Sequence, residues 1–327
     1  MASAVRSMAA GLALLALAAG PVSAMDPAYP SRTIRIVVGF SAGGAPDALA
    51  RIVGEKLGQT WGQSVVVENR VGAQGNIAMA AVAKAPPDGY TLALMPIGNA
   101  AVNPWLFADL PYDPVKDFEP ITQIATVENV LVVGAQQPVG SIGDLVSLGR
   151  SGTAGLTYAT PGAGSLAHLA AELFARGTGL PIRHVPYRGV APALTDVMRG
   201  EVTLTFAQLS TAKPLIDDGQ LRALGIASRE RSAVLPEVPT VAEAAGLPEF
   251  EAVSWYALMA PAGTPEPVVR RIHQEVARIV HLPEIKAAME AQGAKPVGNT
   301  PAELARVIAD DTARWGRIIR EANIKAN

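Results

Sequence analysis

The sequence contains no cysteine and has no excess of positive charge. The missing thiol excludes a disulfide, a zinc–thiolate centre and a cysteine nucleophile. The 27 basic residues are outnumbered by 29 acidic ones, which gives no support to nucleic-acid binding. The four histidines show no metal-ligand grouping, and no Walker, GxGxxG or HExxH pattern occurs. We therefore expect no metal ion, no cofactor and no nucleic-acid partner.

The chain also has little that resembles a membrane span. Beyond the N-terminus, no apolar run reaches the roughly 20 residues that a span requires. Residues 1–24 are typical of an export signal: Arg6 supplies the positive charge, residues 8–19 are apolar, and Val22-Ser23-Ala24 offers small residues for cleavage. We expect this signal peptide to be removed, leaving a soluble protein that begins at Met25 or Asp26. An uncleaved membrane anchor is the alternative.

Strand-like and helix-like segments alternate along the rest of the chain. Strands are predicted at residues 34–38, 64–68, 91–95, 130–133, 156–159, 182–185, 202–206, 221–227 and 254–259. Helices are predicted at residues 47–57, 76–83, 142–150, 166–176, 192–199, 265–280, 283–292 and 301–322. This order indicates α/β architecture with parallel sheets covered on both faces. About 300 mature residues exceed what one core usually serves, so two lobes are expected. We place lobe 1 at residues 25–124 and 248–327 and lobe 2 at residues 125–247, with two chain crossings.

The most informative stretch follows the first strand, from Phe40 to Asp47. Ser41, Ala42, Gly43 and Gly44 leave several successive amides without bulky cover. Exposed amides at a helix start, together with the positive end of the helix dipole, favour an anion. Asp47 either complements that dipole or accepts a hydrogen bond from a donor at the far end of a ligand.

A second loop of similar chemistry runs from Thr160 to Ser165. Gly162 and Gly164 offer bare amides, and Ser165 is a good N-cap that could also contact a ligand. His168, one turn into the helix, is either a packed core residue or a ligand contact. Two such loops far apart in sequence suggest two walls of one cleft that holds an anion.

Polar residues after two other strands are further candidates. Asn99 follows the third strand, and Gln208 follows the strand at residues 202–206, where ligands of open α/β sheets bind. A hydrolase based on Ser165 and His168 is a different class of function. It is disfavoured because the final glycine of the nucleophile elbow is absent. We therefore predict no catalytic residue and no enzyme activity.

Several motifs together resemble one family. They are AGGAPDALAR at residues 42–51, QSVVVENRVGAQGN at 63–76, APPDGYTL at 85–92, LPYDPVKDFEPIT at 110–122, GAGSLAHLAAELF at 162–174 and HVPYRGVAPALTDVMRGEV at 184–202. In this order they resemble the Bug/TctC family, the periplasmic solute-binding proteins of tripartite tricarboxylate transporters. Ala45-Pro46, Ala78 and Gln208 depart from residues that are frequent there, which leaves the ligand's identity open.

The resemblance implies a type II periplasmic-binding-protein fold, with two α/β lobes around a central cleft. It implies a monomer in the periplasm that captures a di- or tricarboxylate, an acidic amino acid or an aromatic acid. The implied ligand contacts are Phe40, Ala42, Gly43, Gly44 and Asp47 in one lobe, and Thr160, Gly164, Ser165 and His168 in the other. The implied partner is a set of membrane transporter subunits. A signalling receptor, served by an orphan ligand sensor, is the alternative.

Overall fold

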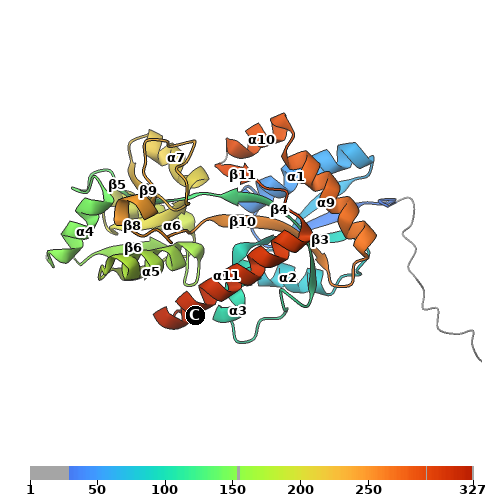
Figure 1. The fold of residues 1–327 in the computed structure, drawn as a ribbon, viewed down its shortest axis with the longest axis horizontal. Coiled ribbons are helices and arrows are strands. Elements are labelled where there is room, and N and C mark those ends of the chain that lie inside the picture. The colour runs from blue at the N-terminus through green and yellow to red at the C-terminus, as the bar shows by residue number, and fades with distance from the viewer. Residues whose placement is uncertain (1–28, 153–154, 292, 326–327) are drawn as a thin grey trace, which may run out of the picture.

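The computed structural model describes residues 29–152, 155–291 and 293–325. The predicted signal peptide at residues 1–24 lies outside these residues. Two mixed sheets, each flanked by helices, form two α/β lobes joined by crossing strands (Figure 1). None of the helices within the described ranges is long and apolar enough to cross a membrane.

The first lobe is built on a six-stranded sheet with the spatial order β11-β4-β10-β3-β1-β2. Its strands are β1 (Ile34–Val38), β2 (Val65–Asn69), β3 (Thr91–Pro96), β4 (Phe118–Val127), β10 (Ser254–Pro261) and β11 (Ala294–Pro296). Strands β1, β2 and β3 are parallel, whereas β10 runs antiparallel to both β3 and β4. The parallel part places the carboxyl ends of β1 and β3 at one edge of the sheet, where a ligand site is expected.

The second lobe is built on a five-stranded sheet with the order β7-β6-β8-β5-β9. Its strands are β5 (Asn129–Gly134), β6 (Thr157–Thr160), β7 (Arg183–Pro186), β8 (Leu204–Gln208) and β9 (Leu221–Ile226). Strand β6 is parallel to β7 and β8, and β5 is antiparallel to β8 and β9. The carboxyl ends of β6 and β8 therefore share an edge.

Helices cover both sheets. They are α1 (Ala45–Trp61), α2 (Asn76–Ala83), α3 (Asn103–Leu106), α4 (Ile142–Arg150), α5 (Leu166–Thr178), α6 (Val190–Arg199), α7 (Leu209–Asp217), α8 (Val241–Ala245), α9 (Glu266–Val280), α10 (Pro283–Glu290) and α11 (Pro301–Ala322), with a 3₁₀ turn η1 (Ala73–Gly75) and a π-helical turn η2 (Gly98–Val102). Where a prediction was made, the elements agree to within a few residues. The elements that were missed are β4, β11, α3, α7, α8 and the turns η1 and η2.

The prediction of parallel sheets holds for only part of each sheet, because β10 and β5 pair antiparallel with their neighbours. Strand β4 leaves the first lobe and continues as β5, while the chain returns along β10, and Figure 1 shows β4 and β10 running between the lobes. Two strands that carry the chain out and back run in opposite directions, so they pair antiparallel. Strand β4 extends beyond Ile124 to Val127, and β5 begins at Asn129. The exact limits of the two lobes stay a prediction.

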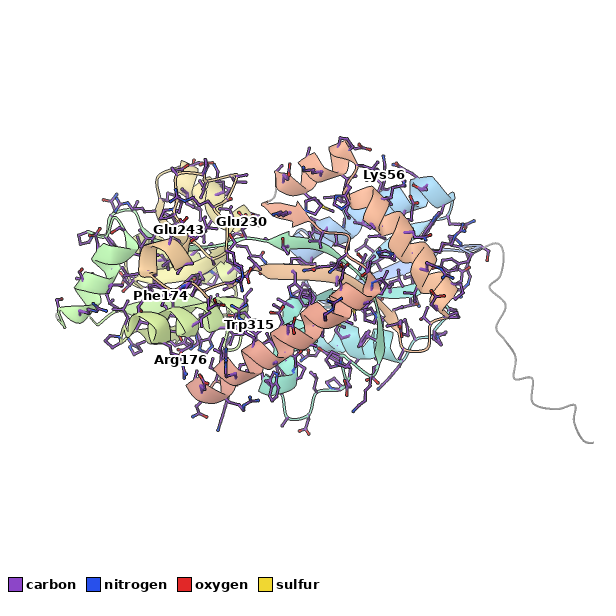
Figure 2. All side chains as sticks on the ribbon, in the orientation of Figure 1. Lys56, Phe174, Arg176, Glu230, Glu243 and Trp315 are labelled. Carbon is purple, nitrogen blue, oxygen red and sulfur yellow. The ribbon has the colours of Figure 1, made fainter. Side chains whose placement is uncertain are left out.

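Helix α11 ties the lobes together. It packs against β4 and η2 of the first lobe and against α5 of the second. Its Trp315 is fully buried in a hydrophobic core that also contains Phe174 of α5 and Phe206 of β8. Figure 2 labels Trp315, Phe174 and Arg176 on the side where α11 meets α5. Burial of aromatic side chains on both sides of this junction stabilises one relative placement of the lobes.

Candidate ligand-binding cleft

A cavity of about 660 Å³ lies between the two lobes. The first-lobe wall consists of Phe40, Ser41, Ala42, Gly44, Ala45, Pro46, Pro96, Ser254 and Tyr256. The second-lobe wall consists of Asn129, Pro161, Ser165, Leu166, Ala167, Gly189, Val190, Ala193, Leu194, Thr205, Phe206, Ala207, Gln208 and Thr211. Both small-residue loops therefore border the same space. Its volume is within the range of small-molecule sites.

Four helices of the described chain begin at this cavity. They are α1, α5, α6 and α7, whose first residues or N-caps are among the lining residues. The N-caps Gly44, Gly189 and Gln208 make no side-chain capping bond, so the first amides of α1, α6 and α7 are not used by a cap. Each helix start adds partial positive charge to the cavity, and α1 and α5 do so from opposite lobes.

The lining side chains carry no formal charge. Among the described residues that border the cavity, none is Asp, Glu, Lys, Arg or His. A bound anion would therefore meet backbone amides, hydroxyl groups and carboxamides. Fixed neutral dipoles of this kind stabilise a carboxylate without a desolvated cation.

Asp47 lies behind the first loop and does not line the cavity. Its carboxylate accepts hydrogen bonds from the Gly43 amide at 2.9 Å, from Asn69 at 3.0 Å and from Arg51 at 3.0 Å. Asn69 also donates to the Phe40 carbonyl at 3.0 Å, so the two side chains fix both ends of the loop. Burial raises the pKa of Asp47, but the hydrogen bonds from its partners outweigh burial and lower the pKa to about 2. The carboxylate is ionised and paired at neutral pH.

Ser165 caps α5 and borders the cavity. Its hydroxyl donates to the Gly162 carbonyl at 2.8 Å and accepts from the His168 amide at 3.4 Å. The imidazole of His168 accepts at Nδ1 from the Gly164 amide at 3.0 Å. The serine hydroxyl and the imidazole thus each bond to the loop backbone and not to each other, which braces the turn at residues 162–165.

His168 is part of a buried cluster behind the second loop. Its ring stacks on His184, with centroids 4.0 Å apart, and His184 Nε2 lies 2.7 Å from Thr160 Oγ1. Burial, and then the proximity of His184, lower the pKa of His168 to about 4. The imidazole is neutral at pH 7, consistent with its role as an acceptor.

Asn99 is buried beneath the turn η1. Its Nδ2 donates to the Gln74 carbonyl at 3.1 Å and to Asn76 Oδ1 at 3.0 Å, and Tyr112 Oη donates to the Asn99 carbonyl at 3.0 Å. These bonds support a turn in which Gln74 has φ 54°. Gln74 Nε2 in turn lies 3.5 Å from the Ala163 carbonyl of the other lobe. The polar cluster therefore holds η1 where the two lobes approach.

Half of the residues predicted for the site line the cavity. Phe40, Ser41, Ala42, Gly44, Ser165 and Gln208 do so. Gly43, Asp47, Asn99, Thr160, Gly164 and His168 do not, and the structure places them in the hydrogen-bonding network that supports the loops. The described residues contain no group of three His, Cys, Asp or Glu side chains that could hold a metal ion.

The sequence analysis missed two parts of the lining. The first part is Gly189 and Val190 at the start of α6. Here, too, a strand is followed by a glycine and then a helix, and this pattern could have identified them from the sequence. Ser254 and Tyr256 lie two residues apart on β10 and so point to one face of the strand. Only the antiparallel placement of β10 beside the crossing shows that this face borders the cavity.

Two α/β lobes around a cavity bordered by helix N-termini are the arrangement of the periplasmic-binding-protein fold. The chain belongs to the tripartite tricarboxylate transporter receptor family, whose model (TctC) matches residues 49–324. The resemblance inferred from the sequence motifs is thereby confirmed.

Individual relatives agree with this assignment. The chain is 38% identical over 322 residues to the UPF0065 protein in the tcbD-tcbE intergenic region of Pseudomonas sp., covering 98% of this chain and 96% of the relative. It is 37% identical to BugT of Bordetella pertussis, covering 94% of each chain.

Among solved structures, Rpa4515 of R. palustris with adipate has 39% identity and a TM-score of 0.82, covering 91% of this chain and 99% of that one. MatC from Rhodopseudomonas palustris with bound malate has 34% identity and a TM-score of 0.77, covering 89% and 100%.

Proposed function

We propose that this protein captures a small carboxylate in the cavity between its lobes and releases it chemically unchanged. The observation that carries the proposal is the convergence of four helix N-termini on a cavity lined by uncharged side chains. Amides from the loop before α1 and from the loop before α5 would hold one carboxylate from two sides. The adipate and malate bound by two neighbours of this chain support the same ligand class.

The available donors are sufficient for useful affinity. A hydrogen bond to a charged group contributes roughly 1.5–3 kcal/mol. A few such bonds supply the roughly 8 kcal/mol of a micromolar site. Because the donors come from both lobes, the full set acts only when the lobes are close together. Ligand would therefore shift the population towards a closed form.

We infer binding without catalysis from the hydrogen bonds of Ser165 and His168. A serine nucleophile must give its proton to a base, whereas the Ser165 hydroxyl donates to the Gly162 carbonyl. The imidazole of His168 already accepts from the Gly164 amide. Binding would leave the ligand intact.

The proposed setting is the periplasm, and the proposed partners are the membrane subunits of a tripartite tricarboxylate-type transporter. The description of the matching family and the periplasmic binding protein BugD among the structural neighbours support this setting. An orphan sensor that passes its closed form to a signalling receptor stays the alternative prediction.

Titration calorimetry with adipate and malate tests the proposal. Gly44→Val should abolish binding without lowering the unfolding temperature, because Gly44 has φ −80° and a Cβ there would meet only ordinary contacts. The added methyl groups would occupy the cavity beside the first amides of α1. Gly155→Val is the matched control, since Gly155 is exposed and a Cβ there would have nothing within 4 Å. Wild-type affinity in the Gly44 variant would remove this loop from the site.

A further inference from the structure

The floor of the cavity is a polar cluster at the point where the chain crosses between the lobes. Gln208 ends β8 of the second lobe, and its Nε2 donates to Tyr256 Oη of β10 at 2.8 Å and approaches Ser254 Oγ at 3.4 Å. Asn129 at the start of β5 donates to the Ala252 carbonyl at 2.6 Å. These bonds connect the end of β8 and the start of β5 to β10 and to the segment that leads into it.

The side chains of this cluster are also exposed to the ligand space. Asn129, Gln208, Ser254 and Tyr256 all line the cavity. Three of them are more than nine-tenths buried, with exposed fractions of 6% for Asn129, 6% for Ser254 and 5% for Tyr256. Because these side chains border the cavity, a ligand in it would contact the cluster.

The hydrogen-bonding capacity of the cluster is only partly used. Gln208 Nε2 has two N–H groups, and both point to oxygens of β10. The Tyr256 hydroxyl accepts one of them, and no described residue accepts the hydrogen of that hydroxyl. Burial raises the pKa of Tyr256, so the hydroxyl keeps its proton at neutral pH. A buried donor without an acceptor is costly, and a ligand atom in the cavity would satisfy it.

We infer that Tyr256, oriented by Gln208, selects among carboxylates by donating a hydrogen bond to an acceptor at the end of the ligand remote from the helix N-termini. This inference rests on the proposed function, because it assumes that one carboxylate is held by the loops before α1 and α5. Tyr256 is the specificity-determining residue, and Gln208 positions it. The favoured ligands carry a hydroxyl or a second carboxylate at the remote end, and a plain alkyl chain leaves the donor unsatisfied.

The Gln208–Tyr256 bond joins residues of the two lobes, so the same contact could instead serve only as a brace of the hinge. The two roles differ in what they do to ligand preference. A brace changes the affinity of every ligand by the same factor, whereas a donor to the ligand matters only for ligands that offer an acceptor.

The test is calorimetry with two matched ligand series, one of four carbons (butyrate, 4-hydroxybutyrate, succinate) and one of six (hexanoate, 6-hydroxyhexanoate, adipate). In the better-binding series, the wild type should bind the hydroxyl or second-carboxylate member at least about tenfold more tightly than the plain acid. Tyr256→Phe should reduce that ratio by roughly three- to tenfold and change the affinity of the plain acid by less than about twofold.

Two further variants keep the result interpretable. Gln208→Ala should reduce the ratio by a smaller factor, because the Tyr256 hydroxyl loses the donor that orients it, and it serves if Tyr256→Phe fails to fold. Tyr90→Phe is the matched control: Tyr90 is a buried tyrosine at the amino end of β3, and its hydroxyl accepts from the Ser31 amide at 3.0 Å. It should leave the ratio unchanged.

The outcomes separate this inference from the proposed function. A wild type without preference, or an equal loss for all ligands in Tyr256→Phe, would overturn the inference and leave carboxylate binding intact. If no member of either series binds to the wild type, capture of linear aliphatic carboxylates fails, and the inference fails with it.

Discussion

Replacing Asp47 by Asn tests the idea that this residue braces the first loop. The hydrogen bonds from Arg51, Gly43 and Asn69 lower the pKa of Asp47 from the ordinary value of 3.8 to about 2. At about 1.4 kcal/mol per pKa unit, the ionised carboxylate stabilises the folded state by about 2 kcal/mol. Asn has the same shape but no charge, so Asp47→Asn should cost about this amount at neutral pH.

The pH dependence gives the sharper readout. A carboxylate with a lowered pKa contributes its full stability above the unfolded value, near 3.8, and loses it as the pH falls towards about 2. The difference in unfolding free energy between wild type and Asp47→Asn should therefore be constant from pH 7 to 5. It should shrink as the pH is lowered to 3 and below. Urea unfolding at these pH values measures it directly.

The chain offers a close control. Asp144 accepts a hydrogen bond from the Gly140 amide at 3.0 Å, the same four-residue spacing as between Asp47 and Gly43, but it is exposed. Asp144→Asn should cost well under 1 kcal/mol, since an exposed carboxylate gains little from such a contact. Equal costs for the two variants, or a difference for Asp47→Asn that persists unchanged at pH 3, would refute the bracing role.

Two other predictions follow from residues behind the loops. The pKa of His168 in the folded protein is about 4, below the ordinary 6.5, so the unfolding free energy should fall as the pH drops from 6.5 to 4. In urea unfolding, His168→Gln should lose much of this pH dependence. An unfolding free energy that depends on pH as in the wild type would contradict the prediction. A Cβ on Gly39 would lie 2.6 Å from Gly75 Cα, so Gly39→Ala should destabilise the folded protein by about 1–3 kcal/mol. It should also weaken ligand binding, because it displaces η1. Calorimetry that finds neither effect would contradict the close approach of Gly39 to Gly75.

Much of the fold could be predicted because its signals are local. The β-branched runs of β1 and β2, and the small-residue turns before α1 and α5, lie within a few residues of the elements they define. The strand β4 was missed because Pro120 interrupts its N-terminal part and its sequence alternates weakly. Its role depends on pairing with β10, more than 120 residues away in the chain, which no local pattern indicates.

The candidate site was predicted at the level of loops but not of individual side chains. Ser41 in the turn and Asp47 in the first turn of α1 belong to the same predicted stretch, yet Ser41 lines the cavity and Asp47 is buried against Asn69 and Arg51. The difference is set by the partner strand β2, which carries Asn69. A sequence motif identifies the turn but does not show which side of it meets another element.

The sequence alone determined that two glycine-rich turns begin helices and that exposed amides there favour an anion, because backbone geometry and the helix dipole depend on neighbouring residues only. The tertiary structure decided that both turns border one cavity and that Gln208 meets Tyr256 at its floor. Such contacts arise from the path of the chain between the lobes, since residues 48 positions apart come together only after both crossing strands have paired.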